Sequence, residues 1–287
     1  MGFIAKPFCL LSFTLFLLAG FEFLPSVKTA SDITTFVYKG CSSQSFSDPS
    51  YSQSLSALFS SLTAQASQEA FFKTSTGGSL LTIYGLFQCR GDLSNNDCYN
   101  CVSKLPAMAN RLCGNSVAAR IQLYGCYMLY EVSGFPDISG LQLLYKTCSS
   151  SQASGSGFVQ LRDTAFSVLE SGVASNNGFY TTSYQSVYVL AQCEGDLGSA
   201  DCGKCVQAAV QNAQAECGSS TSGQVYLQMC FISYSYRPNG GSRKSSSGIG
   251  QNTGKTIAIV VGGAAALGFL VICLMFIRSL KKKHDDY

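Results

Sequence analysis

The chain has 287 residues and a formal net charge of +3, yet residues 31–238 are slightly acidic, with ten Lys or Arg against thirteen Asp or Glu. This balance argues against nucleic acid as their ligand. Because the single histidine, His284, lies near the C-terminal end, Ser-His-Asp and Cys-His catalysis are excluded in residues 31–238, and we expect no enzyme there.

Residues 1–30 have the features of a secretory signal peptide. Lys6 gives a basic start, an apolar run follows from Phe8 to Gly20, and small residues suited to cleavage lie between Ser26 and Ala30. A membrane anchor is the competing interpretation, but the run is too short for a comfortable span. We therefore expect the following residues to be exported to a compartment in which cysteines form disulfides.

The next hundred residues predict both strands and helices. Thr34 to Cys41 is rich in β-branched and aromatic residues and predicts a strand. After Pro49, apolar residues at helical spacing predict a helix that continues to about Ala66. Gly77 and Gly78 indicate a turn before a strand from Leu80 to Gln88. A long alternating run from Ala118 to Val132 closes this part of the chain.

One motif occurs twice. Gln88 to Val102 reads QCRGDLSNNDCYNCV, and Gln192 to Val206 reads QCEGDLGSADCGKCV. In both copies Gly-Asp-Leu is expected to end the preceding strand, and a helix is expected to begin near Asn96 or Ala200. The recurrence indicates one module built twice.

The second copy has the same series of elements. Gln142 to Cys148 predicts the first strand, and apolar residues from Phe158 to Leu169 predict the first helix. Asn177 and Gly178 indicate a turn, Ser183 to Gln192 predicts a strand, and Gln224 to Tyr236 is the closing run.

Two modules of similar size follow from this repeat, module 1 at residues 31–136 and module 2 at residues 140–238. Each is expected to be α+β, with two helices packed on an antiparallel β-sheet.

Twelve of the fourteen cysteines fall into two sets of six, with identical intervals from the second member to the sixth. The sets are Cys41, Cys89, Cys98, Cys101, Cys113 and Cys126, and Cys148, Cys193, Cys202, Cys205, Cys217 and Cys230. In an exported protein, six cysteines per module predict three disulfides, and the sequence alone leaves fifteen pairings open in each. A zinc site of four thiolates and a redox-active Cys-x-x-Cys pair are the alternatives; we expect neither, and no metal or other cofactor.

The C-terminal part predicts attachment to a membrane. Residues 239–255 form a Gly/Ser-rich stalk without periodicity, expected to be flexible. Residues 256–277 carry no charge and have the length of one transmembrane helix, which residues 278–287 follow as a basic cytoplasmic tail. Three small residues of this span form a ridge suited to helix packing: Ala258, Gly262 and Ala266.

The twin motif resembles the ginkbilobin-homologous, cysteine-rich domain of land plants, and two such modules followed by one span and a short tail resemble the plasmodesmata-located proteins. Cysteine-rich receptor-like kinases carry a similar ectodomain before a kinase domain, for which residues 278–287 leave no room. The resemblance implies two helices on an antiparallel sheet. It also implies the disulfides Cys41–Cys113, Cys89–Cys98, Cys101–Cys126, Cys148–Cys217, Cys193–Cys202 and Cys205–Cys230.

A carbohydrate site is also implied, but it is incomplete. Ginkbilobin binds mannose through an Asn just after the first cysteine, an Arg seven after the fifth and a Glu five after the sixth. Module 1 has Ser42, Arg120 and Glu131 at these places, so the Asn is replaced. Module 2 has none of the three and carries Ser149, Gln224 and Ser235. We expect Arg120 and Glu131 to form a structural pair across adjacent strands rather than a sugar site.

The resemblance implies a non-enzymatic type I protein of the plasma membrane at plasmodesmata, with its modules in the apoplast. It implies regulation of cell-to-cell traffic, promotion of callose deposition and docking of viral movement proteins. The implied partners are the membrane, receptor kinases or other membrane proteins at plasmodesmata, cell-wall glycans, and further copies in homo- or hetero-oligomers. The alternative is an apoplastic mannose-binding or antifungal defence sensor that acts with a kinase partner.

Overall fold

The computed structural model describes residues 32–78, 81–132, 140–154 and 157–238. The predicted signal peptide, stalk, membrane span and tail lie outside the described residues, and so do Ala258, Gly262 and Ala266. Within the described ranges, no helix combines the length and the apolar character needed to cross a bilayer. The described part consists of the two cysteine-rich modules, which belong to one compact unit.

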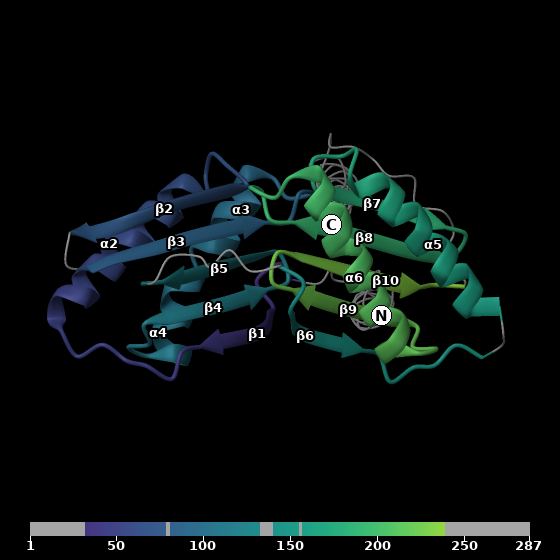
Figure 1. Cartoon of the computed structure of the whole chain (residues 1–287), viewed down its shortest axis with the longest axis horizontal. Coiled ribbons are helices and arrows are strands. Elements are labelled where there is room, and N and C mark those ends of the chain that lie inside the picture. Colours follow the sequence, from purple (N-terminus) through teal and green to yellow (C-terminus); the bar gives the residue numbers. More distant parts are fainter. Residues whose placement is uncertain (1–31, 79–80, 133–139, 155–156, 239–287) are drawn as a thin grey trace, which may run out of the picture. The chain divides into compact units, whose positions relative to one another are not determined.

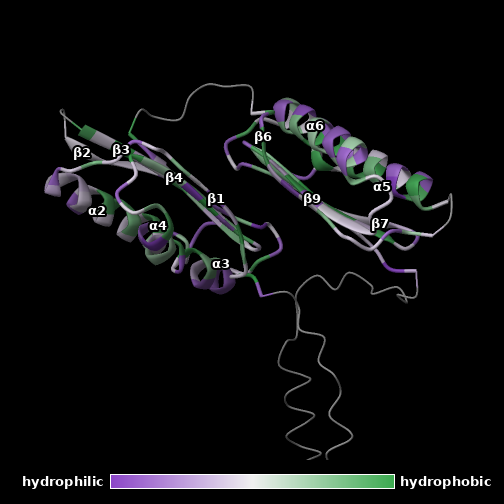
Figure 2. Cartoon of the chain, turned by 90° about the horizontal axis from the view of Figure 1, so that it is seen from below, coloured by the Kyte–Doolittle hydropathy of each residue, from purple (hydrophilic) through white to green (hydrophobic). Residues whose placement is uncertain are grey.

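Each module is a five-stranded antiparallel sheet with its helices on one face (Figure 1, Figure 2). Module 1 contains β1 (Phe36–Cys41), α2 (Pro49–Gln65), β2 (Phe71–Gly78), β3 (Leu81–Cys89), α3 (Asn95–Val102), α4 (Leu105–Cys113), β4 (Ala118–Leu123) and β5 (Cys126–Glu131). Module 2 contains β6 (Leu143–Cys148), α5 (Gly157–Val173), β7 (Phe179–Tyr184), β8 (Val187–Cys193), α6 (Ser199–Cys217), β9 (Ser222–Leu227) and β10 (Cys230–Tyr236). The strand orders β1-β4-β5-β3-β2 and β6-β9-β10-β8-β7 show the same topology, and the predicted α+β class is confirmed.

The first helix of each module forms where the sequence predicts it. Asp48 caps α2, because its carboxylate accepts a hydrogen bond of 2.8 Å from the backbone N–H of Ser50. The face of α2 toward the sheet buries residues at helical spacing, which are Tyr51, Leu55, Leu58, Phe59 and Leu62. The equivalent buried residues of α5 have the same spacing and are Phe158, Arg162, Ala165, Phe166 and Leu169. Leu55 therefore corresponds to Arg162.

The second helix of module 1 is divided in two. α3 ends at Val102 and α4 begins at Leu105, whereas α6 is continuous in module 2. Pro106 lies where α6 has the buried Val210. Proline has no N–H for the carbonyl four residues earlier, and its ring clashes with that carbonyl, so the helix breaks. The prediction of two helices is therefore wrong for module 1 and correct for module 2.

The edge strands β2 and β7 are not among the predicted elements. β2 pairs with β3 through the predicted turn, where Gly77 has a φ of 116° that favours glycine. In module 2 the predicted turn at Asn177 and Gly178 instead precedes β7. The hairpin turn lies at Gln185, so the strand predicted from Ser183 begins too early. Phe71 and Phe179, which begin these strands, are the aromatic signal that could have revealed them.

The closing run of each module is a hairpin of two strands. β4 pairs with β5 through Tyr124 and Gly125, and β9 pairs with β10 in the same way. Inward side chains of β4 and β5, including Ile121 and Met128, pack with the helices in the core of module 1. The alternate side chains, including Arg120 and Tyr127, belong to the opposite face of the sheet.

All twelve cysteines of the modules are in disulfides, three in each module. The pairs are Cys41–Cys113, Cys89–Cys98, Cys101–Cys126, Cys148–Cys217, Cys193–Cys202 and Cys205–Cys230, the same as the resemblance implies. The two cysteines of each Cys-x-x-Cys motif are bonded to other partners, so neither motif is a redox-active pair.

Candidate functional site

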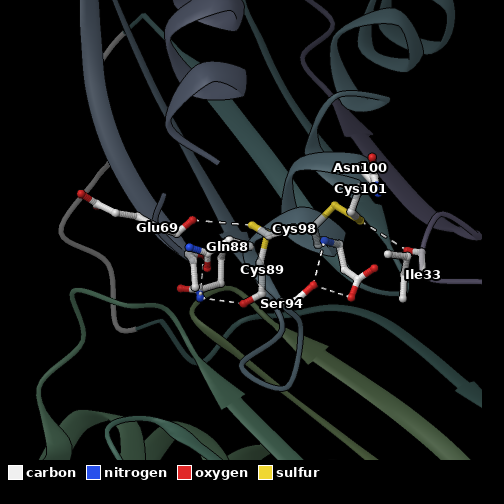
Figure 3. The surroundings of a disulfide bond; sticks show 12 residues. Ile33, Glu69, Gln88, Cys89, Ser94, Cys98, Asn100 and Cys101 are labelled. Atoms are coloured by element: carbon white, nitrogen blue, oxygen red, sulfur yellow. Dashed lines mark hydrogen bonds between the residues drawn. A yellow bond between two sulfur atoms is a disulfide. The ribbon is translucent and has the colours of Figure 1, made fainter. Parts of the chain in front are cut away.

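In each copy of the repeated motif, a disulfide joins the last residue of a strand to the helix that follows the loop. Figure 3 shows the disulfide Cys89–Cys98 at this point, with Gln88 beside it and Ser94 at the start of α3. The Ser94 hydroxyl oxygen accepts a hydrogen bond of 3.2 Å from the Asp97 N–H and caps the helix. The Gln88 side chain donates to the carbonyl oxygens of Ala70 and Cys89, at 3.2 and 2.8 Å. The loop is thus fixed by covalent and polar contacts.

The same motif also connects the two modules. The Gly91 N–H donates a hydrogen bond of 2.8 Å to the side-chain oxygen of Gln192, the first residue of the second copy. A methyl group on Gly91 would lie 2.5 Å from Cγ of Phe179, and one on Gly195 would lie 2.5 Å from Cγ of Phe71. Each module therefore places the first aromatic residue of an edge strand on the motif glycine of the other. The glycines are needed because any side chain would overlap the ring.

Replacing Gly91 with alanine is expected to lower the free energy of unfolding by about 2 kcal/mol, because overpacking of a filled contact strains its surroundings. Chemical denaturation of the full-length protein in detergent micelles, followed by circular dichroism, measures the change. Combining Gly91→Ala with Phe179→Ala should cost less than the sum of the two single changes, since the clash is then removed. Gly203→Ala is the matched control: nothing lies within 4 Å of its added methyl, so no loss is expected. Additive costs for the first pair would contradict the contact.

Arg120 forms the center of a buried polar cluster between the modules. Its Nη1 donates a hydrogen bond of 2.8 Å to the carbonyl oxygen of Gln228 in module 2, and its guanidinium lies 3.9 Å from the center of the Tyr127 ring. The Tyr127 hydroxyl donates a hydrogen bond to Oε2 of Glu194, also in module 2. Arg120 and Glu194 are only 9% and 8% exposed, so this charge pair is largely shielded from water.

Burial controls the electrostatics of this cluster. Desolvation raises the pKa of the Glu194 carboxyl, while the Tyr127 hydrogen bond and the positive charge of Arg120 oppose the rise. The pKa of the Tyr127 hydroxyl is also raised by burial and by Glu194. Glu194 occupies the position that Arg90 has in the first motif copy. Arg90 instead pairs with Asp92 of its own loop, at 2.6 Å.

The candidate carbohydrate residues Ser42, Arg120 and Glu131 lie on or directly next to neighbouring strands, and the Ser42 N–H donates a hydrogen bond of 2.9 Å to the Ala118 carbonyl oxygen. Arg120 pairs in register with Leu129, and Glu131 pairs with Ala118. No ion pair joins Arg120 to Glu131, both of which lie in the described range 81–132. The predicted structural pair is therefore wrong, because Arg120 is directed to module 2.

Ser42 and Glu131, the other two candidate residues, differ in their immediate environment. The Ser42 hydroxyl accepts a hydrogen bond of 3.1 Å from the Gln44 N–H. Glu131 is half-buried, and desolvation raises the pKa of its carboxyl. Mannose binding through the three residues stays a prediction, and the geometry gives Arg120 a different role.

The corresponding face of module 2 is open. A groove of about 590 Å³ contains the three residues at the equivalent positions, Ser149, Gln224 and Ser235. The Gln224 side-chain oxygen accepts a hydrogen bond of 2.8 Å from the Tyr226 hydroxyl. At these three positions module 2 has neither the arginine nor the carboxylate of the mannose site, although Arg237 also lines the groove.

Comparison with known proteins agrees with the two modules. The family described as salt stress response/antifungal matches residues 40–133 and 147–237. Plasmodesmata-located proteins 2 and 1 of Arabidopsis thaliana are 57% and 45% identical to the chain, with 91% and 92% of the chain and 92% and 95% of the relatives covered. The crystal structure of the tandem DUF26 ectodomain of the Arabidopsis thaliana cysteine-rich receptor-like protein PDLP8 aligns with a TM-score of 0.66 at 30% identity, covering 71% of this chain and 98% of that one. The chain therefore belongs to the family of plasmodesmata-located proteins.

Proposed function

We propose that the chain is a type I membrane protein of plasmodesmata that regulates the movement of molecules between cells and catalyses no reaction. The observation that carries this proposal is the 57% identity to plasmodesmata-located protein 2 over 283 residues, an alignment longer than the two modules together. In the proposed topology, residues 256–277 cross the plasma membrane, the modules face the apoplast and residues 278–287 face the cytoplasm.

The described structure supports binding rather than catalysis in the modules. Their cysteines are all in disulfides, and a buried polar cluster around Arg120 holds one module to the other. A body fixed in this way presents constant surfaces to partners. We propose that these partners are receptor kinases or other membrane proteins of the channel, and that their recruitment promotes callose deposition. Docking of viral movement proteins is proposed on the same basis.

Localisation in plant tissue tests the proposal. The full-length protein with a C-terminal fluorescent label is expected to give punctate spots across the walls between leaf cells, at sites that also stain for callose. Raising its amount is expected to slow the spread of a freely diffusing fluorescent protein into neighbouring cells. The matched control replaces residues 256–277 with the span of an unrelated type I protein and should give uniform surface labelling.

Uniform surface labelling of the unaltered protein would overturn the plasmodesmal assignment and favour a sensor distributed over the plasma membrane. Punctate labelling without any change in diffusion would overturn the regulatory role alone.

A further inference from the structure

Module 1 has a groove in its helical layer. It lies between α2 on one side and α3 and α4 on the other, and its volume is about 610 Å³. This volume is within the range of small-molecule binding sites. The groove is separate from the Arg120 cluster, because Arg120 projects from the opposite face of the sheet. We refer to it as the helix groove.

The helix groove has an apolar floor and uncharged polar walls. Tyr51, Leu55 and Phe59 form the floor and are almost completely buried. The α2 wall carries hydroxyl groups at helical spacing, on Ser52, Ser56, Ser60 and Thr63. The facing wall carries Tyr99, Asn110 and Asn115, and the Tyr99 side chain is 42% exposed. The lining contains no Lys, Arg, Asp or Glu.

Most of these polar side chains have hydrogen-bonding capacity available. The Ser60 hydroxyl donates to the Ser56 carbonyl oxygen at 2.9 Å, and the Tyr51 hydroxyl donates to the Ser116 carbonyl oxygen at 3.1 Å. Within the described ranges, the other hydroxyl and amide side chains of the walls make no hydrogen bond. Each can both donate and accept.

The floor of the groove differs in module 2, where the buried Arg162 corresponds to Leu55. Arg162 is 2% exposed, and its guanidinium donates a hydrogen bond to the carbonyl oxygen of Gly218. Gly218 ends α6 as Gly114 ends α4, and Gly114 borders the helix groove. The guanidinium also pairs with Asp163 at 2.9 Å. Module 2 therefore places a charged pair at the positions where module 1 has the uncharged Leu55 and Ser56.

The helices opposite α2 and α5 also differ between the two modules. Tyr99 and Asn110 of the groove wall correspond to Gly203 and Gln214 of α6. Pro106, which divides α3 from α4, also lines the groove. Three features make the groove: an uncharged wall, an exposed aromatic ring and a broken helix. All three occur in module 1 and not at the equivalent positions of module 2.

We propose that the helix groove binds a neutral oligosaccharide. Hydroxyl and amide groups that donate and accept match sugar hydroxyls, which do the same. The exposed Tyr99 ring and the apolar floor offer a surface for the C–H face of a sugar ring. An amphipathic helix is a poor fit, because it would place its apolar face against the four hydroxyl groups of α2. The absence of charge in the lining excludes recognition of acidic ligands by ion pairing. This inference goes beyond the proposed function and does not depend on it.

The test transfers the module 2 arrangement to module 1. Full-length protein in lipid nanodiscs is titrated with short neutral glucan, mannan, xylan and galactan oligosaccharides, with an oligogalacturonide as the acidic control. At least one neutral oligosaccharide should bind. Leu55→Arg combined with Ser56→Asp should abolish its binding, because the new pair puts charge into the uncharged lining of the groove, at the positions that Arg162 and Asp163 have in module 2. Tyr99→Ala should raise the dissociation constant about tenfold by removing the ring.

Two controls keep the result interpretable. Gln53→Ala changes an exposed α2 residue outside the groove lining and should leave binding unchanged. Free thiols would show that the charged double variant fails to fold. In that case the binding measured for Tyr99→Ala decides the test, because Tyr99 is exposed and its replacement leaves the core intact. The proposal is overturned if no neutral oligosaccharide binds, or if binding survives both groove variants. None of these outcomes affects the localisation test.

Discussion

Replacing Arg120 with leucine is expected to lower the free energy of unfolding by about 3 kcal/mol, because a buried charged group would lose its compensation. Three contacts disappear at once: the 2.8 Å hydrogen bond to the Gln228 carbonyl oxygen, the stacking on the Tyr127 ring, and the positive charge near Glu194. Denaturation of the full-length protein in detergent micelles measures the loss. Arg120→Lys should recover part of it, since lysine keeps the charge but not the planar group that stacks on Tyr127.

The loss of stability in Arg120→Leu is expected to depend on pH, because the charge of Glu194 does. Burial raises the pKa of this carboxyl in the folded protein, so its contribution to stability is present below the unfolded pKa and is lost as the pH rises through the folded value. Without Arg120 the folded pKa of Glu194 rises further. Arg120→Leu should therefore cost more at neutral pH than at about pH 4, where the carboxyl is protonated. In a Glu194→Gln background this pH dependence should disappear. The same loss at both pH values would contradict a role for the Arg120 charge at Glu194.

The role of Arg120 shows what the sequence could not predict. Its alternation with Ile121 correctly places it on the sheet face away from the core. Its hydrogen bond, however, is to Gln228, and its charge acts on Glu194, and both residues lie far along the chain in the other module. Resemblance to ginkbilobin directs attention to Glu131 instead. Contacts created by docking of two domains leave no periodic pattern in either one.

The local features were predictable where the physical cause is local. The cysteine register identifies both modules, and apolar spacing identifies α2 and α5. The elements that were predicted wrongly also have local causes in the sequence. Pro106 divides the second helix of module 1, and Phe71 and Phe179 begin the strands that pattern analysis omits. The glycine in each copy of the motif is explained only by those two phenylalanines, which pack against it from the other module.

The duplication also shows which parts of the two modules differ. Both keep the disulfides, sheet order and reciprocal phenylalanine contacts, which are the parts that hold the unit together. The differences lie in single side chains placed on this frame, such as Leu55 against Arg162, and Arg120 against Gln224. Single side chains can thus change the chemistry of a surface in one module without a change in fold.

Removing the disulfide Cys41–Cys113 is expected to lower the free energy of unfolding by about 4 kcal/mol, because the bridge closes a long loop in the unfolded chain. Its cysteines are 72 residues apart, whereas those of Cys89–Cys98 are 9 apart. Replacing both cysteines of the shorter bridge with alanine should cost only about 2 to 3 kcal/mol on the same basis. Denaturation under non-reducing conditions, with each pair changed to alanine, measures both losses.

The long bridge also secures an element of the module contact. Cys41 ends the edge strand β1, whose Tyr38 stacks on Tyr145 of module 2 with ring centers 5.1 Å apart. Cys148–Cys217 is the matched control, since it closes a loop of 69 residues and fixes β6, which carries Tyr145. Its removal should cost about as much as that of Cys41–Cys113, because loop length and strand position are nearly the same. Equal losses for the long and short bridges of module 1 would contradict loop closure as the main source of stability. A much smaller loss for Cys148–Cys217 than for Cys41–Cys113 would contradict the equivalence of the two modules.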